Sequence, residues 1–197
     1  NLPMRLDKNT LIGYLQLENN QKLSSIRFAV EAGDYTEILE ISVHDAGKKK
    51  PGRSIEKLIA KTPVAGGEVN LELDHTAIKG NYLAFNCKLK PDTDLLSRFR
   101  ISVTALTLDG ESVMVKSPNS VIYRPAVKVR TGGDDGSRGY RIPGMVTSQK
   151  GTLLTCYDIR FANNRDLQGH MDIGISRSTD KGQTWEPMRI VLDMGEY

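Results

Sequence analysis

Alternation of apolar and polar residues dominates the first 130 residues of the chain. Six segments alternate with the period of two expected of a half-buried β-strand, or carry a β-rich apolar run. They are residues 11–17, 25–32, 37–44, 68–74, 82–89 and 98–108. In the second of these, Ile26, Phe28 and Val30 would face a core while Arg27 and Glu31 face water. Such strands, separated by Gly, Pro, Asn and Asp, predict an antiparallel β-sandwich.

A second group of alternating segments follows a glycine-rich stretch. Residues 141–147, 152–159, 171–177 and 184–192 predict four strands joined in sequence by short connections. We therefore divide the all-β chain into a sandwich (1–124), a Gly-rich linker (125–139) and a four-stranded module (140–197). Residues 54–59 alone have helical spacing of apolar residues, over a run too short to weigh heavily.

Chain direction sorts the polar residues of the second module onto two edges. Arg141 opens the first predicted strand and Arg160 closes the second, so antiparallel pairing brings them side by side. The loop that follows carries Asp166 over the same edge. The turn at Asp180, which joins the last two strands, must then lie at the opposite edge.

Composition is that of a soluble globular protein and excludes several classes. Hydrophobic residues make up 39% and charged residues 26%, and the net charge is +3. The Lys triplet at 48–50 lies between Gly and Pro-Gly, which favours a solvated loop over a nucleic-acid contact. No apolar run reaches the roughly 20 residues of a membrane span. The chain begins at Asn1 without Met, which we interpret as a processed or trimmed terminus.

The histidines and cysteines, which could bind metals or form disulfides, are scattered along the sequence. His44 and His75 lack a second ligand at a metal-compatible interval. Cys87 and Cys156 fall in different modules, each inside a predicted strand, so two buried thiols are favoured over a disulfide. We expect no metal and no cofactor. Two consecutive Asp residues at 134–135, among glycines, favour turn chemistry over a cation site.

Two motifs in the second module carry a family resemblance. Residues 178–185, Ser-Thr-Asp-Lys-Gly-Gln-Thr-Trp, match the Asp-box pattern at every defined position. Residues 140–143, Tyr-Arg-Ile-Pro, match the Arg-Ile-Pro motif that precedes the first Asp box in sialidases, and Tyr-Asp-Ile-Arg lies between them at 157–160. The module thus resembles the first blade of the six-bladed propeller of a bacterial exo-α-sialidase. The first 130 residues are similar, more loosely, to the sandwich that precedes the propeller in Bacteroides-type sialidases, with carbohydrate binding as a candidate role.

The resemblance implies roles for three residues. Arg141 would be the first of three arginines that clamp the sialic acid carboxylate, a task suited to the planar guanidinium fork. Arg160 would line the sugar pocket, with a salt bridge to Asp158 as an alternative or additional role. Asp166 would be the general acid/base, and the nearby Asp158 and Asp172 fit a structural role better.

The resemblance also implies what this chain lacks. The Tyr nucleophile of the family and the two remaining arginines belong to later blades. We therefore expect the N-terminal part of a longer, secreted or cell-surface enzyme that hydrolyses terminal α-linked sialic acids of glycoproteins, glycolipids and oligosaccharides. This part alone would be inactive. The Asp box, with Asp180, Gly182 and Trp185, would be structural. The alternative is a non-catalytic Asp-box protein that binds carbohydrate or mediates adhesion.

Overall fold

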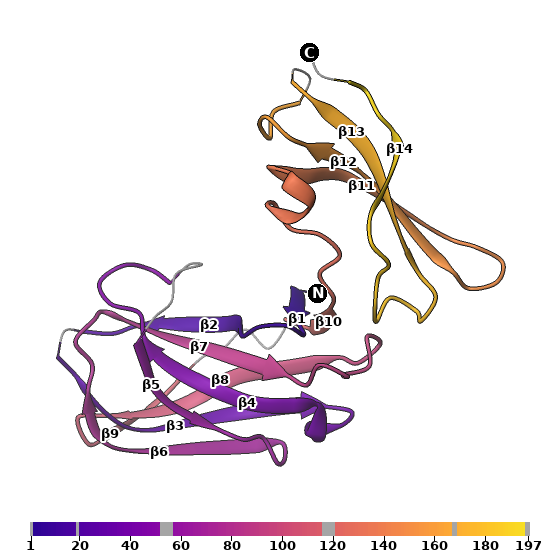
Figure 1. Ribbon diagram of the computed structural model, residues 1–197. Coiled ribbons are helices and arrows are strands. Elements are labelled where there is room, and N and C mark those ends of the chain that lie inside the picture. Colours follow the sequence, from indigo (N-terminus) through magenta and orange to yellow (C-terminus); the bar gives the residue numbers. More distant parts are fainter. Residues whose placement is uncertain (1, 19, 52–56, 116–120, 167–168, 196–197) are drawn as a thin grey trace. The chain divides into compact units, whose positions relative to one another are not determined.

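The chain folds into two all-β units (Figure 1). The computed structural model describes residues 2–18, 20–51, 57–115, 121–166 and 169–195. The first unit is Asn1–Ala126 and the second is Val127–Tyr197. All-β was the fold class expected from alternation, and it is confirmed.

The helices of the described residues are two short 3-10 turns, η1 (Tyr35–Glu37) and η2 (Asp134–Gly136). Neither comes near the length or the apolar character that crossing a membrane requires, and no other described segment is helical.

Two sheets form the first unit. The six-stranded sheet has the order β1-β10-β8-β3-β6, with β9 also pairing with β8. Its strands are β1 (Leu2–Arg5), β3 (Lys22–Ala32), β6 (Glu68–Ala77), β8 (Phe99–Leu108), β9 (Glu111–Met114) and β10 (Tyr123–Ala126). The four-stranded sheet has the order β2-β7-β4-β5, made of β2 (Thr10–Gln16), β4 (Ile38–Asp45), β5 (Lys57–Thr62) and β7 (Tyr82–Leu89). All pairs are antiparallel except β1 with β10.

The core of this unit contains the apolar faces of both sheets. Ile26, Phe28 and Val30 are at most 3% exposed, as their alternation in β3 predicted. Phe28 packs edge-to-face on Phe85 of the other sheet, with ring centroids 5.7 Å apart. A fully buried side chain of this size stabilises the fold by about 1.5–3 kcal/mol, so this contact is central to holding the two sheets together.

The weak helical spacing at residues 54–59 does not lead to a helix in the described residues. Residues 57–59, part of the stretch with helical spacing, lie in β5, which pairs with β4 through Val43 and Ala60. The other residues of that stretch, 54–56, lie outside the described part of the chain. Pairing along an available sheet edge outweighs the weak helical preference of a short run.

The second unit is one antiparallel sheet whose strands follow one another in sequence. Its strands are β11 (Gly139–Thr147), β12 (Leu153–Arg160), β13 (Met171–Ser178) and β14 (Arg189–Leu192). These correspond to the four predicted strands. The last begins at residue 189 rather than 184, because residues 180–184 belong to a hydrogen-bonded turn.

The glycine-rich segment before β11 is folded onto this sheet. The amide of Arg138 donates to the carbonyl of Arg160 at 2.7 Å, and Arg130 Nη2 donates to the carbonyl of Glu186 at 3.1 Å. A Cβ on Gly132 would lie 2.6 Å from the carbonyl oxygen of Arg138, so only glycine permits this approach. Residues 127–138 therefore belong to the second unit.

Tyr140, on the edge strand β11, holds that segment against the sheet. Its hydroxyl donates to the Asp135 carboxylate at 2.7 Å and lies 2.9 Å from the carbonyl oxygen of Asp134. Its ring packs edge-to-face on Tyr157, with centroids 5.2 Å apart. Burial, with a contribution from the Asp135 carboxylate, raises the pKa of Tyr140 to about 12. Asp134 and Asp135 thus take part in the hydrogen bonds of the 3-10 turn η2.

The cysteines differ from the expectation of two buried thiols. Both are free, and Cys87 is buried in the sandwich, where desolvation raises its pKa to about 12. Cys156 is exposed, so the prediction is wrong for that residue. It pairs across β11 with Gly144, which has no side chain to cover it.

Candidate functional site

The β11–β12 hairpin sets the positions of both predicted site arginines. Arg141 pairs with Asp158, and Gly139 pairs with Arg160, so the two arginines lie at the same end of neighbouring strands. The loop that follows β12 is closed at its base. The Phe161 amide donates to the His170 carbonyl at 3.2 Å, and the two rings stack with centroids 4.3 Å apart.

The structure brings Arg141, Arg160 and Asp166 together. Arg141 Nη1 lies 2.6 Å from Asp166 Oδ1, and Arg160 Nη2 lies 3.4 Å from the same oxygen. Arg141 Nη1 also donates to the carbonyl of Asn164 at 2.8 Å. The side chain of Asp166 is 66% exposed and that of Arg141 is 37% exposed, so this carboxylate and one of its two cations face solvent.

Arg160 is buried and has a partner of its own. Its Nη2 lies 2.7 Å from Asp158 Oδ2, the ion pair considered from the sequence. The side chains of Arg160 and Asp158 are 6% and 15% exposed. Arg160 also donates to the carbonyl of Arg165, while its Nε is buried without a hydrogen-bond partner among the described residues. Two arginines thus bind the backbone of the Asp166 loop, through the carbonyls of Asn164 and Arg165.

Strained backbone lies directly beside Arg141. The pairing of β11 with β12 is interrupted by a bulge between Arg141 and Gly144. Inside it, Ile142 has φ of +51°, a left-handed conformation that is unusual for a β-branched residue and for one that precedes proline. Bulges redirect the neighbouring side chains, and strain of this kind concentrates at functional sites. Alternation alone gave no signal for this bulge.

A second cluster near the loop was missed by sequence reasoning. Ligand-type atoms of His170, Asp172 and Asp193 lie within 4.8 Å of one another. Asp172 is buried, and its Oδ1 accepts from the Met194 amide at 3.0 Å and lies 3.6 Å from His170 Nε2. The His-x-Asp spacing was visible in the sequence, but the approach of Asp193 was not. This cluster ties the chain after β14 to the start of β13.

The Asp-box turn lies at the other end of the sheet. Asp180 accepts hydrogen bonds from the Thr184 amide at 2.9 Å, the Thr184 hydroxyl at 2.5 Å and the Ser178 hydroxyl at 2.7 Å. Hydrogen bonding from Thr184 lowers the pKa of Asp180 to about 2. Gly182 has φ of +92°. Ser178 ends β13, whereas Arg160 pairs with Met171 at its start, so β13 separates the turn from the arginines.

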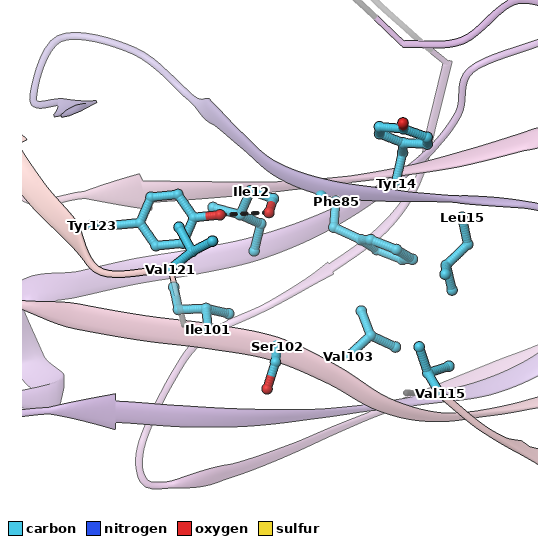
Figure 2. Close-up of a pocket in the computed structure, with 11 residues that line it drawn as sticks. Ile12, Tyr14, Leu15, Phe85, Ile101, Ser102, Val103, Val115, Val121 and Tyr123 are labelled. Atoms are coloured by element: carbon cyan, nitrogen blue, oxygen red, sulfur yellow. Dashed lines mark hydrogen bonds between the residues drawn. The ribbon is translucent and has the colours of Figure 1, made fainter. Parts of the chain in front are cut away.

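The sandwich contains a cavity of about 390 Å³ between its two sheets (Figure 2). Its lining is mainly aliphatic and aromatic, and none of the described residues that line it is charged. The Tyr123 hydroxyl donates to the Ile12 carbonyl at 2.6 Å, and Figure 2 shows that bond beside the cavity. The described lining would contact a ligand mainly through apolar groups.

Comparison with known proteins points to one family. No family model matches the sequence. The sialidase of Bacteroides fragilis (strain YCH46) is 43% identical over 163 residues, which is 80% of this chain and 30% of that protein. The sialidase of Paraclostridium sordellii is 45% identical over 47 residues, 24% of this chain and 11% of that protein. The chain therefore spans less than a third of the length of these relatives.

A solved structure extends the likeness to the fold. The Hadza microbial sialidase Hz136 superposes with a TM-score of 0.78 at 30% sequence identity, covering 96% of this chain and 42% of that chain. Both units are thus included in the comparison. From sequence identity over most of its length and a shared fold over nearly all of it, this chain is a homologue of the sialidases.

Proposed function

We propose that this chain is the N-terminal part of an exo-α-sialidase that hydrolyses terminal α-linked sialic acids. In this proposal the sandwich, 1–124 by the sequence division, is an accessory domain, and residues 140–197 are the first blade of a six-bladed catalytic propeller. The stretch 125–139 joins the two and is hydrogen-bonded to the blade. The lengths of the relatives support a longer protein, because this chain covers only 30% of the Bacteroides fragilis sialidase and 42% of the solved Hz136 chain. The open sheet supplies another reason, since its edge strands carry exposed apolar side chains, among them Met145, Val146 and Ile190.

The observation that carries the proposal is the convergence of two arginines on one carboxylate. Sialic acid is an anionic sugar, and Arg141 would bind its carboxylate through the guanidinium fork. Arg160, held by Asp158, would contact substituents of the sugar ring. Asp166 lies within hydrogen-bond reach of both arginines, at 2.6 and 3.4 Å, so it would lie beside a sugar bound there.

In the reaction, Asp166 would donate a proton to the oxygen of the leaving group and later remove one from water. The nucleophile would be a Tyr activated by a Glu, both outside this chain, because a carboxylate nucleophile would face the carboxylate of the substrate. The proposed mechanism requires no metal or cofactor. Sialylated glycoproteins, glycolipids and oligosaccharides would be the substrates, met outside the cell or at its surface. This chain alone would not turn over a sialoside.

The leaving-group dependence of the full-length parent tests this assignment. Asp166→Ala should cut kcat strongly on sialyllactose, whose leaving group needs protonation. It should cut kcat much less on a nitrophenyl or methylumbelliferyl sialoside, whose leaving group departs without it.

Glu186→Gln is the matched control, because Glu186 is an exposed carboxylate on the same unit, 3.3 Å from Arg177. That variant should retain activity on both substrates. Equal losses on the two substrates for Asp166→Ala would remove Asp166 from the acid role. Turnover by the isolated 197-residue chain would refute the need for later blades.

The rival function is a non-catalytic Asp-box protein that binds carbohydrate. A pure scaffold has no need of an acid beside two arginines, which favours the enzyme. Sequencing of the region downstream separates the two. Further strand-end arginines and a late Tyr with a Glu partner support the enzyme, and their absence supports the binder.

The sandwich offers one surface for a carbohydrate-binding role. Tyr14 and Tyr82 pack edge-to-face with centroids 6.1 Å apart, Tyr14 is 39% exposed, and Lys50 Nζ lies 5.0 Å from the Tyr14 ring centroid. Aromatic rings beside a cation suit an acidic glycan. In a chain carrying Arg141→Ala, we expect Tyr14→Ser to abolish sialyllactose binding by the sandwich. Unchanged binding would remove this surface from the proposal.

A further inference from the structure

Arg141 already holds an anion. Its Nη1 donates to the Asn164 carbonyl at 2.8 Å and lies 2.6 Å from Asp166 Oδ1. A substrate carboxylate that binds end-on, through Nη1 and Nη2, needs a hydrogen of Nη1, and the Asn164 carbonyl and Asp166 already occupy that nitrogen. In any other approach, two carboxylates share the charge of one guanidinium.

The two arginines differ in how firmly they are paired. Arg160 is 6% exposed and has Asp158 as a close partner at 2.7 Å, so its contact with Asp166 at 3.4 Å is secondary. The Arg141–Asp166 pair is 37% and 66% exposed. Exposed ion pairs are weak and exchange readily, whereas buried pairs are costly to break. Of the two arginines, Arg141 is therefore the one that can exchange its carboxylate partner.

The backbone of the loop can stay in place while this exchange occurs. Arg141 and Arg160 bind the carbonyls of Asn164 and Arg165, and these contacts do not involve the Asp166 side chain. A rotation of the Asp166 side chain alone would release Arg141. No opening of the loop is required.

We infer that Asp166 is a resident counter-ion of Arg141, which the carboxylate of an incoming ligand displaces. Displacement would free the Asp166 carboxylate at the moment the sugar arrives. The inference rests on the proposed function for its biological meaning, but the competition itself concerns any carboxylate that binds at Arg141.

Carboxylate binding by this chain tests the competition directly. The ¹⁵N-labelled chain is titrated with acetate and, separately, with N-acetylneuraminate, and the Nε–Hε resonance of Arg141 is followed by NMR. Asp166→Asn keeps the shape of the side chain and removes its charge, and Asp166→Ala removes the contact entirely. Glu186→Gln, which removes an exposed carboxylate that pairs with Arg177 instead, is the control.

The inference expects tighter binding when the resident charge is removed. Kd for both ligands should fall roughly two- to fivefold in Asp166→Asn and in Asp166→Ala, the range set by an exposed ion pair. The Glu186→Gln variant should match the unmodified chain. The gain should shrink in high salt, because exposed charges are screened.

Opposite outcomes overturn the inference and separate it from the proposed function. Equal or weaker carboxylate binding in both Asp166 variants refutes the resident counter-ion, whatever the parent enzyme does. Tighter binding of acetate, combined with a parent that does not cleave sialosides, keeps the inference and refutes the function.

Discussion

Removal of the Asp158 carboxylate should destabilise the second unit substantially. Asp158→Ala would leave the Arg160 guanidinium, 6% exposed, with the more distant Asp166 oxygen at 3.4 Å and the Arg165 carbonyl. Breaking a fully buried pair costs about 3–5 kcal/mol. Since Asp166 stays within reach and Asp158 is itself 15% exposed, we expect a loss of about 2–3 kcal/mol.

The double substitution provides the internal check. Asp158→Ala combined with Arg160→Met removes both charges and leaves an apolar side chain in place of the guanidinium. Because a buried pair replaced by apolar groups is often neutral in stability, the double variant should recover most of the loss. Glu186→Gln removes one partner of an exposed pair, with 49% and 38% of the two side chains accessible, and should cost less than about 1 kcal/mol.

The assay can read the second unit alone. The chain has a single tryptophan, Trp185, and it belongs to that unit. Urea unfolding followed by tryptophan fluorescence should show the midpoint of Asp158→Ala lowered by about 0.7–3 M, given slopes of about 1–3 kcal/mol/M. A loss below about 1 kcal/mol, or a double variant less stable than either single one, would refute the assignment of a buried, interdependent pair.

Three further predictions concern single groups. Hydrogen bonds from Thr184 lower the pKa of Asp180 from 3.8 to about 2. The ionised carboxylate therefore contributes its full stabilisation above pH 3.8 and loses it as the pH falls toward 2. Asp180→Asn should flatten the acid-unfolding profile in this window. The pKa of Tyr140 is raised from 10.0 to about 12, so the contribution of the neutral phenol to stability is complete below pH 10 and is lost as the pH rises toward 12. Tyr140→Phe should lower the free energy of unfolding by about 1 kcal/mol at neutral pH and flatten the alkaline-unfolding profile. Both effects can be measured by circular dichroism. A thiol reagent should modify Cys156 quickly and Cys87 only after unfolding, and two fast thiols would contradict the burial of Cys87.

The sequence was sufficient for strands that have one buried face. β3 and β6 alternate because Phe28 and Val69 face a core while Arg27 and Asn70 face water, and both strands were predicted. β1, β5, β9 and β10 were not, although β10 contains the buried Tyr123. Each is short or half-exposed; all four residues of β9 are exposed, so no alternation marks it. Pairing of such strands with their neighbours is a tertiary effect, and a local pattern does not encode it.

The candidate site was predictable in its location and in one contact, the Arg160–Asp158 ion pair, but not in its other contacts. Chain direction placed Arg141, Arg160 and Asp166 at one edge, and the structure brings them together. Their chemical roles stay predictions. The hydrogen bond from Arg141 to the Asn164 carbonyl depends on the path of a loop backbone, for which the residue types give no rule. The left-handed backbone at Ile142 runs against the preference of its own side chain, so reading propensities could only miss it.

That residue has a consequence for anyone who engineers the protein. Ile142 is 62% exposed and makes no contribution to a buried core within its unit, yet it holds a conformation that glycine would adopt at lower energy. A screen for heat resistance of this 197-residue chain should therefore enrich Ile142→Gly or Ile142→Asn early, because Ile142 packs in no buried core there. Variants selected in this way would hold Arg141 less rigidly, so the screen would raise the melting temperature while loosening the orientation of that arginine.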